Sequence, residues 1–279
     1  MDKLLTDPRN IRARLAAHGF AFSKRLGQNF LADSRVPDIM ASFFDPGQAV
    51  LEIGPGFGAL TAALCEVCGA VVAVEKDKRL LPLLKENLAD CQNLTVIEGD
   101  ALRLDLPSLM PQGLRPAVCA NLPYSVTTPI LTALLESGTF DPIIVMVQRE
   151  VALRLTACPG TPEYGAMTVF TAMSAQCSVL FDVPPESFIP RPAVTSSVVR
   201  LDSLTFDVGM QTLVPTALRL SRAAFAQRRK TLGNALSAGL ALPRESVTER
   251  LKAAGFDPGA RGETISPEGY LSLARFFTP

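Results

Sequence analysis

The sequence predicts an α/β fold in which helices cover both faces of a largely parallel sheet, followed by a smaller all-helical part. From residue 49 to residue 157, short apolar runs alternate with segments of helical periodicity. Two later strand-like segments are joined by a long, proline-rich connection with no helical pattern, which fits an antiparallel addition at a sheet edge. After that addition only helical patterns occur. We therefore expect a first domain over residues 1–204 and a helical second domain over residues 205–279.

The expected strands are apolar, often β-branched runs that end in glycine or polar residues. They cover residues 49–53, 70–75, 94–98, 118–120, 143–148, 177–183 and 196–201. The helices of the first domain are expected at residues 8–20, 34–44 (capped by Asp33 or Ser34), 60–68, 78–89, 127–136, 150–157 and 165–176. The helices of the second domain are expected at residues 211–227, 229–239, 244–254 and 267–277.

Composition excludes several classes of protein. Apolar residues make up 48% of the 279, enough for a sizeable core. No apolar run reaches the ~18 residues that span a bilayer, and the first residues lack the apolar segment of a signal peptide, so we expect a cytoplasmic protein without a membrane anchor. The only histidine is His18, and Cys65 and Cys68 have no second cysteine pair, so we expect no metal site and no histidine-based catalysis.

The charge is zero overall but unevenly distributed. No acidic residue occurs between Val208 and Arg244. The same stretch contains Arg219, Arg222, Arg228, Arg229, Lys230 and Arg244. Such a distribution suits binding to a polyanion, although solvated helix faces would have the same appearance.

A glycine-rich turn at Gly54–Gly58 joins the first expected strand to a helix. Glycines let the backbone approach a ligand closely, and in a parallel sheet this turn faces the ligand crevice. Gly54, Gly56 and Ala59 also match the dinucleotide fingerprint G-x-G-x-x-A. The next two strands each end in a carboxylate: Glu75, placed to hold ribose hydroxyls, and Asp100, placed near a base amino group. Two successive carboxylates, followed by Asn121–Tyr124 after the fourth strand, favour S-adenosylmethionine over NAD, although both carboxylates could also cap helices.

Asn121, Leu122, Pro123 and Tyr124 end the fourth expected strand and form a candidate site for a flat ring with an exocyclic amine. Asn121 Oδ1 and a main-chain carbonyl can accept the two N–H bonds of an amino group, and Tyr124 can stack on the ring. Pro123 fixes its own φ and biases Leu122 to an extended conformation, which aims the carbonyl. An ordinary proline turn after a strand is the alternative.

With these motifs, the chain resembles the ribosomal RNA adenine N6-dimethyltransferases, and within them the bacterial small-subunit branch. The resemblance rests on segments in the order of that family. They are Lys24–Leu31, Leu51–Gly56, Val74–Glu75, Gly99–Ala101, Asn121–Tyr124, Met146–Ala152, Phe188–Ser196 and Phe225–Leu232. It implies a class I methyltransferase fold: a Rossmann-like, seven-stranded mixed sheet with a small C-terminal helical domain that binds RNA.

The resemblance also implies roles for individual residues. Contacts to S-adenosylmethionine are implied for Asn29, Leu31, Gly54, Gly56, Glu75, Asp100 and Asn121. Asn121, Leu122, Pro123 and Tyr124 would receive the target adenine, with Phe188 on the other face of the ring. Arg222, Arg228 and Arg229 would neutralise RNA phosphates.

The implied reaction is dimethylation of N6 on two adjacent adenosines in a hairpin loop near the 3′ end of small-subunit (16S) rRNA. The implied partner is the small ribosomal subunit, and we expect a monomer that needs no metal. Three alternatives stay open: a large-subunit adenine methyltransferase of the macrolide-resistance type, an NAD-dependent dehydrogenase, and a non-catalytic RNA-binding assembly factor. Arg228–Leu232 and Gly27–Phe30 favour the small-subunit branch.

Overall fold

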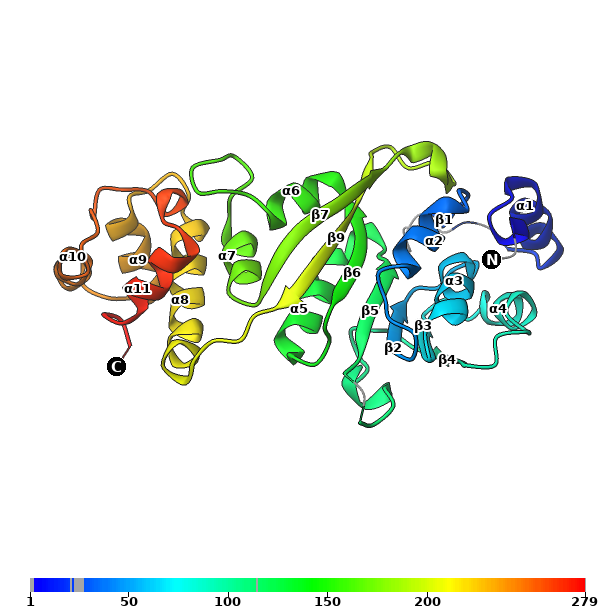
Figure 1. Cartoon of the computed structure of the whole chain (residues 1–279). Coiled ribbons are helices and arrows are strands. Elements are labelled where there is room, and N and C mark those ends of the chain that lie inside the picture. Colours follow the sequence, from blue (N-terminus) through cyan, green and yellow to red (C-terminus); the bar gives the residue numbers. More distant parts are fainter. Residues whose placement is uncertain (1–2, 21, 23–27, 114, 279) are drawn as a thin grey trace. The chain divides into compact units, whose positions relative to one another are not determined.

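A computed structural model describes residues 3–20, 22, 28–113 and 115–278. Its main feature is a seven-stranded mixed sheet in the order β4-β3-β2-β5-β6-β9-β7 (Figure 1). The strands are β2 (Ala49–Ile53), β3 (Ala70–Glu75), β4 (Leu94–Glu98), β5 (Ala117–Asn121), β6 (Ile143–Gln148), β7 (Ala175–Val183) and β9 (Ser196–Ser203). Strands β2 to β6 pair in parallel, and β9 pairs antiparallel with β6. The expected sheet and its antiparallel addition are confirmed.

The chain order reverses between β2 and β5. From β2 the chain proceeds outward through β3 to β4, and then returns to β5 on the other side of β2. At such a reversal the loops after two neighbouring strands diverge and leave a crevice at the carboxyl ends of the strands. The fold therefore places the loops after β2, β3 and β5 around one potential binding site.

Both faces of the sheet are covered. The helices of this part are α1 (Pro8–Ala17), α2 (Arg35–Ala41), α3 (Ala59–Val67), α4 (Leu81–Asn87), α5 (Thr127–Ser137) and α6 (Arg149–Leu155). Val50 and Val71 belong to a core cluster that also contains residues of α2 and α3. Since alternate strand residues point to opposite faces, Leu51 and Val72 face the other side, where they are also buried.

A second, two-stranded sheet pairs β1 (Phe30–Leu31) with β8 (Phe188–Ile189), and Leu31 lies opposite Phe188. The main chain continues this contact, because the N–H of Ala32 donates to the carbonyl of Ser187 at 2.7 Å. Sequence patterns did not predict this pair, because two-residue strands leave no periodicity to read and their partners lie far apart in the chain. The pair fixes the segment that carries Asn29 and Leu31.

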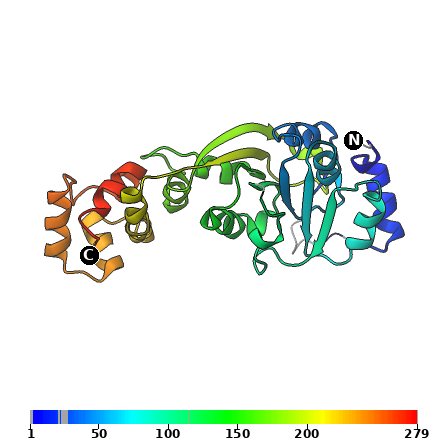
Figure 2. The ribbon, with the colours of Figure 1, turned by 60° about the horizontal axis from the view of Figure 1, so that its bottom comes forward.

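The chain divides into two compact units, Met1–Ala152 with Ser178–Ser203, and Leu153–Cys177 with Leu204–Pro279. The second unit contains α7 (Ala166–Ala172), α8 (Val208–Ala226), α9 (Leu232–Leu240), α10 (Arg244–Ala253) and α11 (Pro267–Ala274). Figure 2 shows α8 to α11 grouped together, in yellow to red. The expected boundary after residue 204 differs from this division, because residues 153–177 join the second unit. The reason is Tyr164, which packs in the core of that unit and donates its hydroxyl to the carbonyl of Ile265 at 2.7 Å.

Candidate cofactor and adenine site

A cavity of about 220 Å³ lies at the carboxyl ends of β2, β3 and β5, within the first unit. The structure brings the residues expected to contact the cofactor together at its wall: Asn29, Leu31, Gly54, Gly56, Glu75, Asp100 and Asn121. Leu122, Pro123 and Tyr124 also line it. Residues 24–27 of the first family motif lie outside the described residues.

The glycine turn after β2 forms one side of this cavity. Gly54 and Gly56 have φ angles of 72° and 60°, which L side chains rarely adopt. A Cβ atom on Gly56 would lie 2.9 Å from the ring of Phe30. Any side chain at this position would therefore push against β1, so the turn presents bare backbone to the cavity.

Glu75 is a buried carboxylate at the end of β3, 6% exposed. Its Oε2 accepts the main-chain N–H of Gly56 at 3.2 Å, and its Oε1 accepts that of Asp77 at 2.7 Å. Burial raises the pKa of this carboxyl, and the two hydrogen bonds oppose that rise. An ionised carboxylate has about four lone-pair sites, so Glu75 can also accept hydroxyl hydrogens from the cavity.

Asp100 follows β4 and forms an ion pair that the sequence did not indicate. Its Oδ2 lies 2.7 Å from Nζ of Lys76, which also lines the cavity, and its Oδ1 accepts the N–H of Leu102 at 3.2 Å. The hydrogen bond with Lys76 lowers the pKa of Asp100, so the carboxyl stays ionised. A negatively charged acceptor is therefore available where a base amino group is expected.

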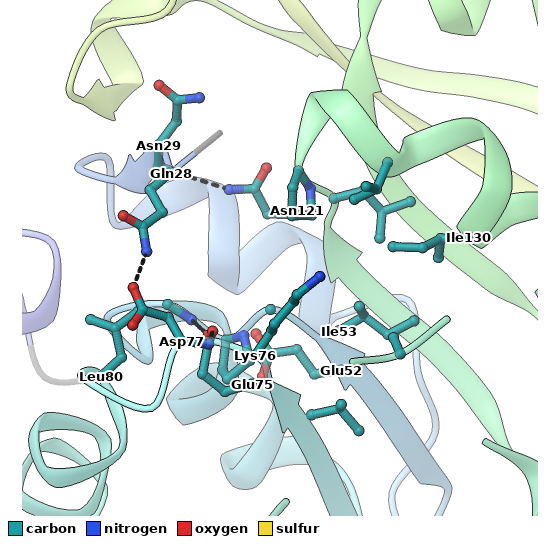
Figure 3. Close-up of a pocket in the computed structure, with 18 of the residues that line it drawn as sticks. Gln28, Asn29, Glu52, Ile53, Glu75, Lys76, Asp77, Leu80, Asn121 and Ile130 are labelled. Carbon is teal, nitrogen blue, oxygen red and sulfur yellow. Dashed lines mark hydrogen bonds between the residues drawn. The ribbon is translucent and has the colours of Figure 1, made fainter. Parts of the chain in front are cut away.

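The side chain of Asn121 has a defined orientation. Its Nδ2 donates to the main-chain carbonyl of Asn29 at 3.0 Å, as Figure 3 shows. Since the hydrogen-bonding partner decides which end of an amide is nitrogen, this contact leaves Oδ1 as the acceptor end. The segment before β1 thus holds Asn121 in the orientation that amine recognition requires.

The rest of the tetrapeptide is also anchored. The N–H of Leu122 donates to the carbonyl of Met146 at 3.1 Å, and Pro123 has φ −60°. The carbonyl of Pro123 accepts from Val126 and Thr127, whereas the carbonyl of Leu122 accepts no hydrogen bond from the described parts of the chain. The carbonyl of Leu122 is therefore free to act as the second acceptor, beside Asn121 Oδ1, for the two hydrogens of an amino group.

Tyr124 begins a short 3₁₀ turn, Tyr124–Val126. Its hydroxyl and the hydroxyl of Ser196 form a hydrogen bond of 2.7 Å. Burial raises the pKa of this phenol, so it stays protonated at neutral pH. Because one end of the ring is tied to β9, its face has a fixed position beside the cavity.

The structure does not bring Phe188 to the cavity. Its side chain is 2% exposed and belongs to the core cluster of the first unit, on the strand that pairs with β1. A ring enclosed in this way cannot stack on a base without leaving the core. Phe188 instead supports the segment that orients Asn121.

The three expected RNA-binding arginines differ from one another. Arg222 and Arg229 are exposed and form no ion pair within the described parts of the chain. Arg228 is held by the second unit: its Nε lies 3.1 Å from Oε2 of Glu263, and its NH2 group donates to the carbonyls of Pro162 and Tyr164. The guanidinium of Arg228 therefore has a structural role that the sequence did not predict.

Sequence reasoning also missed residues that shape the cavity. Gln28 Nε2 donates to Oδ2 of Asp77 at 2.9 Å, which ties the segment before β1 to the loop after β3 (Figure 3). Glu52 lines the cavity from β2 and is 1% exposed, and its Oε2 has no hydrogen-bond partner among the described residues. Burial raises the pKa of Glu52 to about 8. Lys76 and Asp77 could have been found from the sequence, because they directly follow Glu75 at the end of a strand.

Comparison with known proteins identifies the family. The model of the family "Ribosomal RNA adenine dimethylase" matches residues 19–278. The chain belongs to this family. It is 42% identical over 282 residues to ribosomal RNA small subunit methyltransferase A of Alkaliphilus metalliredigens, with 99% of this chain and 98% of the relative covered. It is 43% identical over 287 residues to the protein of the same name from Pelotomaculum thermopropionicum, with 98% and 97% covered.

Solved structures agree on the fold. A dimethyladenosine transferase from Plasmodium falciparum matches with a TM-score of 0.74 at 24% identity, covering 87% of this chain and 95% of that one. The 23S rRNA methyltransferase ErmE matches with a TM-score of 0.68 at 26% identity, covering 88% and 98%. The expected methyltransferase fold and family are confirmed. This member of the adenine dimethylase family is an rRNA adenine dimethyltransferase with S-adenosylmethionine as its methyl donor.

Proposed function

We propose that this dimethylase modifies N6 of two adjacent adenosines in a hairpin loop near the 3′ end of small-subunit rRNA, acting on the small ribosomal subunit in the cytoplasm as a monomer. The observation that carries the adenine site is the contact between Asn121 and Asn29, which presents Oδ1 beside the cavity. The names of the relatives, at about 40% identity over nearly the whole chain, support the small subunit as the source of the RNA.

The residues at the cavity fit the methyl donor. In the proposed placement, Glu75 holds the ribose, Asp100 accepts from the base amino group, and the bare backbone at Gly54 and Gly56 lies against the methionine part. When bound, S-adenosylmethionine supplies a methyl group that its sulfonium activates, because a neutral thioether is a good leaving group. The chain contributes the position and the electrostatics around the target amine.

Asn121 Oδ1 and the Leu122 carbonyl would accept the two hydrogens of the adenine amino group. The lone pair of that nitrogen is delocalised into the ring, so it is a weak nucleophile. Two acceptors favour a pyramidal nitrogen and the positive charge that grows on it during attack, which stabilises the transition state more than the ground state. Tyr124, tied to Ser196, would stack on the base as it leaves its loop.

Of the three arginines expected to bind RNA, Arg222 and Arg229 are available to its phosphates, because both are exposed and form no ion pair in the part of the chain that the structure describes. Such contacts position an RNA without reading its sequence.

Among the described residues, no helix is long and apolar enough to cross a bilayer.

The proposal is tested by incubating the protein with radiolabelled S-adenosylmethionine and, separately, undermethylated small subunits, free small-subunit rRNA and large subunits. We expect N6,N6-dimethyladenosine at two adjacent positions of small-subunit RNA only. Labelling of the large subunit would favour the macrolide-resistance type instead. Binding to small subunits without any labelling would indicate an assembly factor.

A further inference from the structure

Lys76 lies at the wall of the cavity, next to Glu75 in the sequence and paired with Asp100 in the structure. It directly follows Glu75 at the end of β3, and Asp100 follows the end of β4, the neighbouring parallel strand. Glu75 and Glu98 are partners in the register of these strands, so the residues that follow them meet at one edge. Lys76 Nζ lies 2.7 Å from Asp100 Oδ2, and Figure 3 shows the lysine side chain extended along the pocket.

Both oxygens of Asp100 are already engaged. Oδ2 accepts from Lys76, and Oδ1 accepts from the N–H of Leu102. A second cation, Arg103, has its Nε 3.9 Å from Oδ2, and its side chain is 86% exposed. Each oxygen keeps a second lone pair, so an amino group that binds Oδ2 must share this oxygen with the ammonium of Lys76, whose positive charge weakens it as an acceptor.

We propose that Lys76 is a specificity-determining residue of the cofactor pocket. Its ammonium competes with the amino group of the adenosyl base for Oδ2 of Asp100, and this competition sets how tightly and how selectively the pocket holds adenine. The inference rests on the proposed placement of the adenosyl group at Asp100.

Exposure limits the size of the effect. The side chains of Lys76 and Asp100 are 59% and 24% exposed, so their pair has the strength of a surface ion pair. Releasing Asp100 from this pair is expected to tighten adenosyl binding by about two- to fivefold. The substitution Lys76→Met isolates the charge, because methionine keeps an unbranched apolar stem of similar course.

Selectivity gives a second signature of the same competition. Hypoxanthine has a carbonyl oxygen where adenine has its amino group. That oxygen is repelled by the carboxylate of Asp100 but accepts a hydrogen bond from the ammonium of Lys76. Lys76 therefore narrows the preference for adenine over hypoxanthine, and Lys76→Met is expected to widen it.

The experiment is calorimetric titration of the full chain with S-adenosylhomocysteine and S-inosylhomocysteine at several salt concentrations. These thioethers lack the sulfonium charge, whose own attraction to carboxylates would vary with salt. We expect Lys76→Met to bind S-adenosylhomocysteine two- to fivefold more tightly than the unmodified protein at low salt. We expect this gain to shrink as salt screens the ion pair, and the preference for adenine to increase.

Lys78→Met is the matched control. Lys78 is an exposed lysine two residues away and has no ion pair within the described parts of the chain, so its substitution should change neither affinity nor preference. Equal or weaker binding by Lys76→Met, relative to this control, would overturn the inference, because the ammonium would then support the base rather than compete with it.

Two further outcomes concern the proposed function itself. If Asp100→Asn leaves the affinity for S-adenosylhomocysteine and the preference for adenine unchanged, the base does not lie at Asp100. Both the proposed placement of the adenosyl group and the proposed role of Lys76 would then be wrong. If the unmodified protein binds neither thioether, the cofactor site has been placed wrongly.

Discussion

The side chain of Asn121 donates to the main-chain carbonyl of Asn29 across 3.0 Å, although 92 positions separate the two residues in the sequence. This bond turns an amide at the end of β5 into a directed acceptor. The segment that holds Asn29 is itself fixed by the pairing of β1 with β8. The orientation of the oxygen that we propose to act on the substrate amine thus depends on a strand pair far from it in the chain.

The first prediction concerns this amide. Asn121→Ala is expected to lower the single-turnover rate of methyl transfer by at least about 10²-fold, the typical cost of one transition-state acceptor or donor. Binding of S-adenosylmethionine, measured by calorimetry, should weaken far less. Asn93→Ala is the control, because Asn93 also donates to main-chain carbonyls, those of Cys65 and Cys68, but does not line the cavity. Similar rates for the two variants would contradict the role of Asn121.

The second prediction concerns the backbone at Gly56. Alanine at Gly56 and at Gly138 meets the same strain, because their φ angles are 60° and 61°. Only at Gly56 does the added Cβ meet another group, the ring of Phe30 at 2.9 Å. Gly138→Ala should lower the free energy of unfolding by about 1 kcal/mol and leave cofactor binding intact. Gly56→Ala should lower the free energy of unfolding further and abolish cofactor binding measured by calorimetry. Equal stability and equal binding of the two variants would contradict the close contact between position 56 and the ring of Phe30.

The third prediction concerns pH and Glu52. The ordinary pKa of this carboxyl is 4.5, and burial raises it to about 8 in the folded protein. A group that binds its proton more tightly when folded stabilises the protein below pH 4.5, and this stability is lost as the pH rises to about 8. We therefore compare the free energies of unfolding in urea of Glu52→Gln and the unmodified protein. As the pH rises from 5 to 8, the value for Glu52→Gln should increase by a few kcal/mol relative to that of the unmodified protein.

Glu98→Gln serves as the control for that series, since Glu98 is exposed at the end of β4. This variant removes an exposed carboxyl, so its difference from the unmodified protein is the baseline for the series. A Glu52→Gln difference that follows this baseline across the whole pH range would contradict the prediction.

The fourth prediction separates two adjacent arginines. Arg229→Ala is expected to weaken binding to small subunits and to reduce the slope of log affinity against log salt by about 1, because one phosphate contact is lost. Thermal stability should not change. Arg228→Ala should instead lower the melting temperature, because it removes the ion pair with Glu263 and the hydrogen bonds to the carbonyls of Pro162 and Tyr164. Filter binding measures the affinity for small subunits, and scanning calorimetry measures the melting temperature. A lower melting temperature for Arg229→Ala, together with weaker subunit binding but an unchanged melting temperature for Arg228→Ala, would contradict the prediction.

Much of the first unit could be predicted because its strands have strong local signals. The runs at 49–53, 70–75, 94–98 and 143–148 have the same bounds in the structure. The runs at 49–53, 70–75 and 143–148 are almost wholly buried strands, which leave short apolar runs bounded by glycine or polar residues, and the run at 94–98 is the more exposed strand at the edge of the sheet. The carboxyl ends of these strands therefore predicted the position of the cavity.

Contacts distant in sequence could not be predicted. Phe188 had been expected to stack on the substrate base, but its pairing with Leu31 places it in the core. Arg228 looked like its neighbour Arg229, because only the folded unit brings Glu263 beside it. Lys76 gave no sign of its ion pair with Asp100, since the pair depends on the register of β3 and β4. Local patterns carry no information about such partners.

The composition of the second unit from two chain segments has a consequence during synthesis. Residues 153–177 leave the ribosome well before the helices α8 to α11 against which Tyr164 and Val169 pack. A nascent chain that ends near residue 204 must therefore carry these apolar side chains uncovered until the last helices emerge. Shortened chains of this kind should be prone to aggregation, and the carboxyl-terminal helices complete the protein rather than extend it.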